Sequence, residues 1–344
     1  LKKNFNSIWE EALDVYLERL DPNKNIFLSE ELNEFKQDID GKTDIKDNLE
    51  VAYNVFKRYG KRYQNRYEQQ IKFLKEISEQ DIKSSKKIIR DRSEAERLDS
   101  LKALEVSWRD LLVNDVIQLM LSGNNLKDSA EKTLKRLKNQ YRYFNQTRNE
   151  DIFNLYINSI SSIYGPHTSY MSPKSTEDFD INMSLSLEGI GALLSPDGPY
   201  TSISSLIPGG PAEKSGLLKA KDKIIGVGQA GDDEITDVIG WRLDDVVELI
   251  RGPKDSKVRL EIIPGNSLDD SVTKEIEIIR NLVKLEDQAA EKKVINIEKD
   301  NKNFKIGIIE LPAFYFDFEA YQQRDYSYRS SSKDVKKLLQ ELNQ

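Results

Sequence analysis

The sequence contains no cysteine and only one histidine, His167. Without cysteine, the chain has no disulfide, no cysteine nucleophile and no thiolate metal site. A single imidazole is too little for a His-rich metal site or for a catalytic system centred on histidine. We therefore expect neither a metal site nor a cofactor.

Long apolar runs and a dominant charge are also missing. No stretch approaches the 18 consecutive apolar residues that indicate a transmembrane helix. The 52 Lys and Arg nearly balance 59 Asp and Glu, for a net charge of −7, so no overall field favours nucleic acid or an anionic membrane. Tyrosines alternate with basic residues in 57–72 and 127–148, but acidic residues flank both segments. We therefore expect no nucleic-acid partner.

Glycine is scarce in the first 120 residues, which suits helices. Apolar residues recur there at intervals of three and four, first around Trp9, Leu13 and Tyr16, then over 49–74, and again over about 94–121. This spacing predicts amphipathic helices. We assign residues 1–175 to a helical N-terminal region.

The character of the sequence changes near residue 165, where Gly, Pro, Ser and Thr cluster. From 184 to 282, short β-like runs alternate with turns and predict a small β-rich domain. The expected strands are Leu185–Leu194, Tyr200–Ile207, Lys223–Val227, Lys257–Ile263 and Val272–Ile279, with short helices at Pro211–Ser215 and Leu243–Arg251. Residues 283–344 add a strand at Lys305–Leu311 and a helix at Ser332–Leu342, which we interpret as an unfinished β/α unit.

A glycine pattern in Gly226–Gly231 matches G-x-G-x-x-G after a predicted strand. A dinucleotide site needs a helix to begin at that point, so that its N-terminus receives the pyrophosphate. The following residues, Asp232, Asp233 and Glu234, are acidic and would repel phosphate. A glycine-rich hairpin is the better interpretation.

Two further motifs fail on their context. Asp21–Asn25 resembles the start of a calcium loop, but Ile26 occupies the glycine position and Leu32 the position of the bidentate glutamate. Ser330–Lys333 matches the S-x-x-K pattern of a serine nucleophile with a lysine base, yet neither of its companion motifs follows. We interpret this segment as the capped start of a helix.

One constellation is harder to dismiss. Gly189 and Gly191 bracket Ile190 at the entry to a strand, and such a bend directs successive backbone N–H groups into one concavity suited to a carboxylate. The strand that follows can pair with an extended peptide along its edge. The helix at 243–251 carries an apolar stripe, one side of which can form the second wall of a groove. The candidate peptide-binding residues are Leu187, Gly189, Ile190, Gly191, Ala192, Leu193, Leu243 and Val247. The competing interpretation is a β-rich domain whose helix only packs.

Four blocks in this region closely resemble the PDZ domain of the tail-specific (carboxy-terminal processing) proteases. They are Ser186–Leu194, Ile207–Gly216, Asp222–Gly228 and Leu243–Lys254. The resemblance extends to Leu20–Lys24, Pro166–Tyr170 and Ile306–Tyr315, and so covers nearly the whole chain. Two positions depart from the family pattern. Gly165 stands where an acid is usual, and Lys221 replaces a glycine, so the turn at Lys221 either avoids positive φ or is strained.

The resemblance implies an α+β multidomain fold with a helical N-terminal region (1–175), a PDZ-like β-rich module (184–282) and the start of an α/β protease platform (283–344). It implies a periplasmic serine endopeptidase that recognises protein or peptide C-termini. The family's serine nucleophile and its lysine base, whose pKa burial must lower, would lie beyond Gln344. We therefore assign no catalytic residue to this chain. A non-enzymatic PDZ scaffold or adaptor is the alternative, and the oligomeric state stays open.

Overall fold

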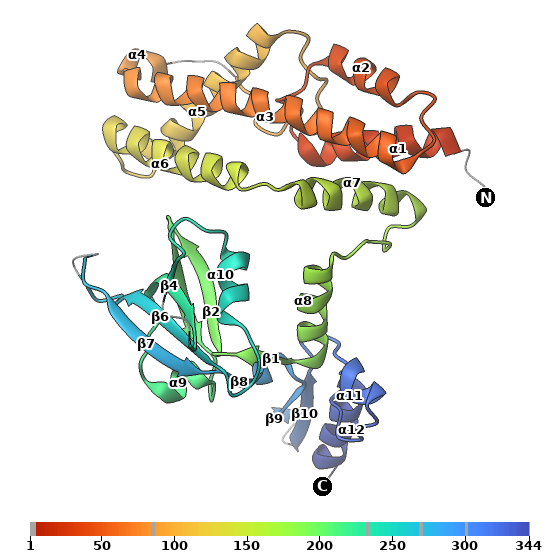
Figure 1. Cartoon of the computed structure of the whole chain (residues 1–344), viewed down its shortest axis with the longest axis vertical. Helices are drawn as coiled ribbons and strands as arrows, with labels where there is room; N and C mark the ends of the chain where they lie inside the picture. The colour runs from red at the N-terminus through yellow and green to blue at the C-terminus, as the bar shows by residue number, and fades with distance from the viewer. Residues whose placement is uncertain (1–4, 84–86, 232–233, 268–270, 300–301, 344) are drawn as a thin grey trace. The chain divides into compact units, whose positions relative to one another are not determined.

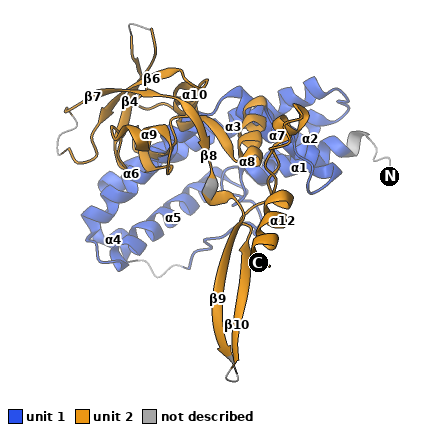
Figure 2. Cartoon of the chain, turned by 90° about the horizontal axis from the view of Figure 1, so that it is seen from below, with its two compact units in different colours: residues 1–172 blue, residues 173–344 orange. Residues whose placement is uncertain are grey.

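The computed structural model describes residues 5–83, 87–231, 234–267, 271–299 and 302–343. The chain divides into two compact units, residues 1–172 and 173–344, which are coloured separately in Figure 2. Each unit is described below by itself.

The first unit is helical, as the spacing of its apolar residues predicts. The periodicity around 94–121 corresponds to a helix that begins only at Leu101, because Ser100 caps it and its hydroxyl accepts a hydrogen bond from Ala103 N at 3.3 Å. The helices are α1 (Phe5–Leu20), α2 (Ser29–Ile39), α3 (Ile45–Glu76), α4 (Glu79–Ile82), α5 (Leu101–Leu121), α6 (Leu126–Asn145) and α7 (Asn149–Tyr164) (Figure 1).

Aromatic residues fill much of the core of this unit. Tyr16 and Tyr156 are fully buried and meet edge to face, with 5.3 Å between their ring centroids. The turn after α1 is organised by Asp21, which is 3% exposed. Its carboxylate accepts hydrogen bonds from the backbone N–H groups of residues 25, 26 and 27 and from Arg97. Asp21 therefore stabilises the turn after α1.

The second unit begins with α8 (Pro173–Ser184) and contains one large antiparallel sheet. Among the described residues, this sheet has six strands in the order β2-β3-β4-β6-β7, with β5 paired to β4. Its elements are β2 (Ala192–Asp197), β3 (Tyr200–Leu206), α9 (Pro211–Ser215), β4 (Lys223–Gln229), β5 (Thr236–Asp237), α10 (Leu243–Ile250), β6 (Lys257–Ile263) and β7 (Lys274–Ile279).

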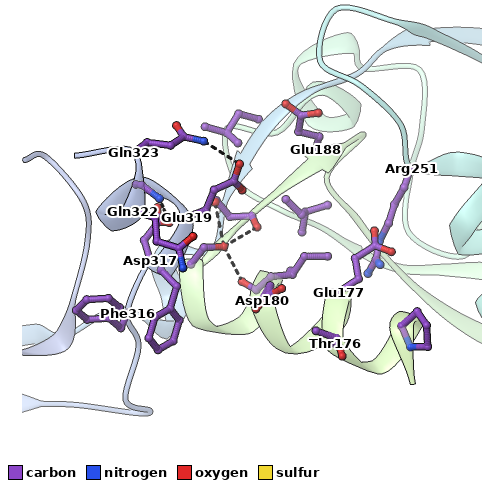
Figure 3. A pocket seen from close by; sticks show the side chains of 18 of the residues that line it. Thr176, Glu177, Asp180, Glu188, Arg251, Phe316, Asp317, Glu319, Gln322 and Gln323 are labelled. Carbon is purple, nitrogen blue, oxygen red and sulfur yellow. Dashed lines mark hydrogen bonds between the residues drawn. The ribbon is translucent and has the colours of Figure 1, made fainter. Parts of the chain in front are cut away.

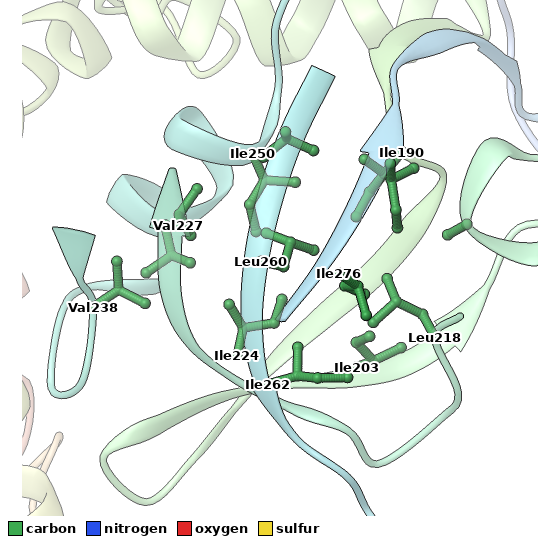
Figure 4. Close-up of a cluster of buried hydrophobic side chains, with 14 residues drawn as sticks. Ile190, Ile203, Leu218, Ile224, Val227, Val238, Ile250, Leu260, Ile262 and Ile276 are labelled. Carbon is green, nitrogen blue, oxygen red and sulfur yellow. The ribbon is translucent and has the colours of Figure 1, made fainter. Parts of the chain in front are cut away.

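Buried aliphatic side chains join the sheet to its two helices (Figure 4). Val246 and Ile250 of α10 and Ala212 of α9 belong to the same core as Val227 of β4 and Leu260 of β6. Burial of apolar area contributes roughly 25 cal/mol per Å², so this core holds α10 against the sheet.

The remaining strands form two separate two-stranded ladders. β1 (Ser186–Gly189) pairs with β8 (Asn281–Lys284), and β9 (Glu291–Lys299) pairs with β10 (Lys302–Glu310). Two helices and a 3-10 turn complete the unit: η1 (Glu286–Gln288), α11 (Phe318–Gln322) and α12 (Ser331–Leu342). Ser330 caps α12, and its hydroxyl accepts from Lys333 N at 3.3 Å, as expected from the interpretation of this serine-rich segment as a helix start.

The glycine pattern at 226–231 begins within β4, which pairs with β5 as the hairpin interpretation predicts. Gly226 and Val227 pair with Asp237 and Thr236 of β5, and a Cβ on Gly226 would lie 2.5 Å from the side chain of Ile235. The glycines therefore let β4 pass beneath Ile235, while Asp232 and Asp233 lie outside the described residues.

The turn before β4 carries the strain that the sequence leaves open. Lys221 has a φ of +74°, in the left-handed region that disfavours side chains other than glycine. The neighbouring Asp222 is 5% exposed and accepts hydrogen bonds from Lys219 N and Gly265 N, each at 2.8 Å. These bonds hold the turn in its strained conformation.

Candidate functional site

Strand β2 is an edge of the six-stranded sheet. It pairs with β3 on one side, and no other strand in the described ranges pairs with its second side. Helix α10 packs beside it. Because an unpaired edge exposes backbone N–H and C=O groups, β2 offers hydrogen-bonding groups to an added strand.

The expected single strand Leu185–Leu194 is divided by a bend at Ile190 and Gly191. Gly191 has a φ of +73°, which turns the chain between β1 and β2. The carbonyl of Ile190 accepts from Ala212 N at 2.7 Å, and that of Gly191 accepts from Ile207 N at 2.9 Å. Both carbonyls are thus bonded within the unit.

The backbone amides of the same bend belong to two buried residues, Ile190 and Gly191. In the part of the chain that the structure describes, neither Ile190 N–H nor Gly191 N–H donates to a protein group. Consecutive amides of this kind form a concavity that binds anions. The bend therefore suits a carboxylate at the start of the β2 edge.

The candidate residues around the bend differ in exposure. Ile190 is 3% exposed and its side chain packs into the core, so it offers its amide rather than its side chain to the groove. Leu193 is 54% exposed, whereas Ala192 is half-buried against the core. Leu187 lies in β1, opposite Val283 of β8, and Gly189 ends that strand.

Helix α10 places its apolar residues on two sides. Val246 and Ile250 are buried in the core, while Leu243 and Val247 are half-exposed. The sequence stripe therefore divides into a buried face and an accessible face, and the accessible residues are the two that we expected in the groove wall. The structure brings β2, the bend and α10 together in one module.

One end of the candidate site is held by contacts between residues distant in sequence. The Glu188 carboxylate accepts from Lys254 N at 3.1 Å, and Gly189 pairs with Asn281. Arg280, which is 2% exposed, donates to the last carbonyls of α10. Sequence reasoning missed Lys254 and Arg280, because no local pattern indicates contacts over such separations.

A cavity of about 1020 Å³ lies next to the bend, between α8, β1, β8 and α11 (Figure 3). Leu187 and Glu188 line it, and four other carboxylates share its wall: Glu177, Asp180, Asp317 and Glu319. Arg251 also lines it and forms an ion pair with Asp178 at 2.8 Å. The cavity is thus acidic, and neither Ile190 nor Gly191 lines it.

Two other features concern cofactors and membranes. Within the described ranges, no group of three or more His, Asp or Glu side chains is arranged to hold a metal ion. No helix in those ranges combines the length and the apolarity needed to cross a bilayer. At the C-terminal end of α10, burial lowers the pKa of the Arg280 guanidinium.

Comparison with known families now adds to this geometry. Residues 2–174 match the model described as the tail specific protease N-terminal domain, and residues 178–263 match that of the PDZ domain. The chain belongs to the tail-specific protease family. Its α+β fold, with a helical region followed by a PDZ domain, is the arrangement that the sequence resemblance implies.

Individual members of the tail-specific protease family and related proteins are similar over different lengths. The Tail-specific protease of Haemophilus influenzae is 37% identical over 337 residues, 97% of this chain and 45% of that protein. The Carboxy-terminal processing protease CtpA of Bacillus subtilis is 33% identical over 142 residues, 41% of this chain and 28% of that protein. The chain thus spans less than half the length of these relatives.

Among solved structures, the PDZ domain of the carboxy-terminal protease from Vibrio cholerae, in complex with peptide, is 51% identical. The similarity covers 29% of this chain and all of that chain, with a TM-score of 0.28.

Proposed function

We propose that the groove between β2 and α10 binds the C-terminal tail of a protein or peptide, and that the chain is the substrate-recognition part of a periplasmic tail-specific serine endopeptidase. Within the described residues, the β2 edge pairs with no second strand and the two amides of the bend donate to no protein group, and these observations together carry the proposal. The match to the PDZ family over residues 178–263 supports it.

In the proposed complex, the peptide extends β2 as an added strand, and its main-chain groups bond to the strand edge. Its terminal carboxylate accepts hydrogen bonds from the amides of Ile190 and Gly191. Its apolar terminal side chain contacts Val247, and Leu243 lines the wall further along. The remaining candidate contacts are Leu187, Gly189, Ala192 and Leu193.

A single shallow groove of this kind gives modest affinity. We expect micromolar to millimolar dissociation constants, equivalent to about −8 to −4 kcal/mol. Charge-assisted bonds to the terminal carboxylate are stronger than bonds to a neutral amide. Selectivity for free C-termini therefore follows from the bend rather than from the strand edge.

We assign recognition to the PDZ module at 184–282, flanked by the helical region 1–175 and the platform segment 283–344. Family resemblance supports a serine nucleophile and a lysine base in the protease, and we assign neither to a residue of this chain. The gene sequence after codon 344 tests this part of the proposal. A serine and a lysine in a β/α context support the protease, whereas an immediate stop codon supports an adaptor.

The binding proposal is tested by titrating the full chain with a peptide that ends in an apolar residue and with its C-terminally amidated twin. Isothermal titration calorimetry should give at least about tenfold tighter binding for the free acid, equivalent to about 1.4 kcal/mol. Equal affinities for the two peptides would exclude capture of the carboxylate. Saturation by neither peptide at millimolar concentration would exclude the groove as a binding site for tails.

A further inference from the structure

Arg280, between β7 and β8, is an almost completely buried cation whose hydrogen-bond partners are all neutral. Its side chain is among the largest fully buried ones in the described residues. The guanidinium makes five hydrogen bonds, to Ile250 O (2.8 Å), Leu249 O (3.1 Å), Lys257 O (3.1 Å), Ser256 Oγ (3.0 Å) and Gln229 Oε1 (2.6 Å). A guanidinium has five N–H donors, so all of them are used.

Burying a cation without a counter-charge is costly, so the location of these partners is informative. Leu249 and Ile250 carry the last carbonyls of α10, which have no partners within the helix. A positive charge at a helix C-terminus is also favoured by the helix dipole. Gln229 of β4 reinforces the same end, since its amide donates to Leu249 O at 2.9 Å. Arg280 thus fastens the C-terminal end of α10 to the strands below it.

The backbone of Arg280 is fixed as firmly as its side chain. Arg280 N donates to Ser256 O at 2.8 Å, and Asp255 N donates to Arg280 O at 2.9 Å. The loop that leaves α10 is therefore folded back onto this residue. A Cβ on Gly252 would lie 3.0 Å from the guanidinium, so a larger residue at that position would crowd Arg280.

The next residue in the chain reaches the opposite wall of the groove. Asn281 pairs with Gly189, the residue that enters the bend. Two consecutive residues therefore hold both sides of the groove, Arg280 through the end of α10 and Asn281 through β1. The distance between Val247 and the bend amides depends on this connection.

We propose that Arg280 is a positioning residue for the peptide groove, which holds α10 at the separation from the bend that a bound tail requires. This inference rests on the proposed function of the groove. Arg280 does not contact the peptide but acts through α10. A lysine has three donors on a single nitrogen and does not reproduce the planar fork that reaches helix and strands together.

The experiment compares four variants of the full chain: Arg280→Met, Arg280→Lys, Gln229→Ala and Ile276→Val. Gln229→Ala removes one neutral partner and serves as a milder variant where Arg280→Met fails to fold. Ile276→Val is the matched control, since Ile276 is buried in the same core but lies in β7, at the sheet edge away from β2. Calorimetry with the free-acid peptide and amide hydrogen exchange provide the two readouts.

If α10 of the Arg280→Met protein occupies its peptide-binding position for about one tenth of the time, the apparent dissociation constant for the peptide rises about tenfold. We expect this tenfold loss of peptide affinity for Arg280→Met and a smaller loss for Arg280→Lys and Gln229→Ala. Ile276→Val should change the affinity by no more than about twofold. In the peptide-free protein, exchange at Arg251 N–H, which donates to Val247 O at 2.9 Å, should accelerate more than exchange in β3 and β4.

Unchanged affinity in folded Arg280→Met or Gln229→Ala protein, or exchange that rises equally in α10 and the sheet, would overturn the positioning role. Failure of the wild-type chain to prefer the free acid would instead overturn the proposed function. The exchange measurement needs no peptide and decides the role of Arg280 in either case.

Discussion

Gly191 and Gly210 pack so closely that a Cβ on Gly191 would lie 3.2 Å from the Cα of Gly210. The same atom would lie 3.3 Å from a methyl group of Val283 in β8. Gly191 also has a φ of +73°. Close packing and backbone conformation thus independently require glycine at the bend.

Gly191→Ala should therefore weaken both the fold and the groove. The left-handed conformation alone costs about 1–2 kcal/mol for alanine, and the crowding at Gly210 has to be relieved by moving the bend. We expect at least about tenfold weaker binding of a free-acid peptide, because the two amides no longer converge. Calorimetric titration of folded protein measures this effect.

Gly198→Ala is the matched control for that variant. Gly198 has a φ of +61° in the β2–β3 turn, and a Cβ there meets nothing within 4 Å. The Gly198→Ala variant should have a lower melting temperature, through the backbone cost alone, and an unchanged peptide affinity. Equal losses of affinity in the two variants would contradict a specific role for the bend.

Local patterns in the sequence were sufficient to predict the secondary structure of the main elements. The helical region, the β-rich module and the two short helices of the PDZ domain follow from apolar spacing and from Pro and Gly punctuation. Boundaries depended on single residues. Ser100 delays the start of α5 to Leu101, and Gly191 divides one predicted strand into β1 and β2.

Other elements depend on contacts that no local pattern reveals. No element was predicted over most of helix α8, which begins at Pro173. Ion pairs join α8 to α10 and to the residue after it, Lys174 to Glu248 and Asp178 to Arg251. The roles of Lys254 and Arg280 likewise come from partners far away in the sequence. The peptide-binding residues themselves stay a prediction until a tail is titrated.

The ion pair between Asp21 and Arg97 should dominate the stability of the helical unit. The two side chains are 2% and 7% exposed and meet at 2.5 Å. Removing one partner leaves the other charge buried and uncompensated, which costs about 3–5 kcal/mol. We expect Asp21→Asn to lower the free energy of unfolding of this unit by that order, as measured by urea denaturation.

A Trp241→Phe background gives this measurement its specificity, because the remaining tryptophans, Trp9 and Trp108, both lie in the helical unit. Asp14→Asn is the control. It breaks the exposed pair with Lys36, whose side chains are 48% and 40% exposed, and should cost less than about 1 kcal/mol. Similar losses of unfolding free energy in Asp21→Asn and Asp14→Asn would refute the importance of burial for the first ion pair.

Alkaline pH should destabilise the helical unit through its buried tyrosines. Burial raises the pKa of Tyr59 to about 12, above the value of about 10 in an unfolded chain. Because the folded pKa is the higher one, the contribution of Tyr59 is complete below pH 10 and is lost as the pH rises towards 12. The total loss for this group is roughly 3 kcal/mol.

Urea denaturation between pH 9 and 12 measures that loss, and Tyr59→Phe should remove part of it. Tyr326→Phe provides the control, because Tyr326 is 88% exposed and lies in the other unit. If the fall of the unfolding free energy with pH is the same in Tyr59→Phe as in the wild type, other groups govern the alkaline transition.

Two adjacent valines of α10 should separate stability from binding. Val246 is fully buried in the core, whereas Val247 is half-exposed on the side of the helix assigned to the groove. Val246→Ala should lower the free energy of unfolding of the PDZ module by about 1–3 kcal/mol, since it leaves a cavity. Val247→Ala should change stability by less than about 1 kcal/mol and weaken binding of an apolar-ended peptide about 3- to 30-fold.

Thermal denaturation and calorimetric titration of both variants, with the free-acid peptide, give the two quantities. A Val247→Ala protein that binds the peptide as tightly as the wild type would remove α10 as a wall of the groove, whatever the behaviour of Val246→Ala.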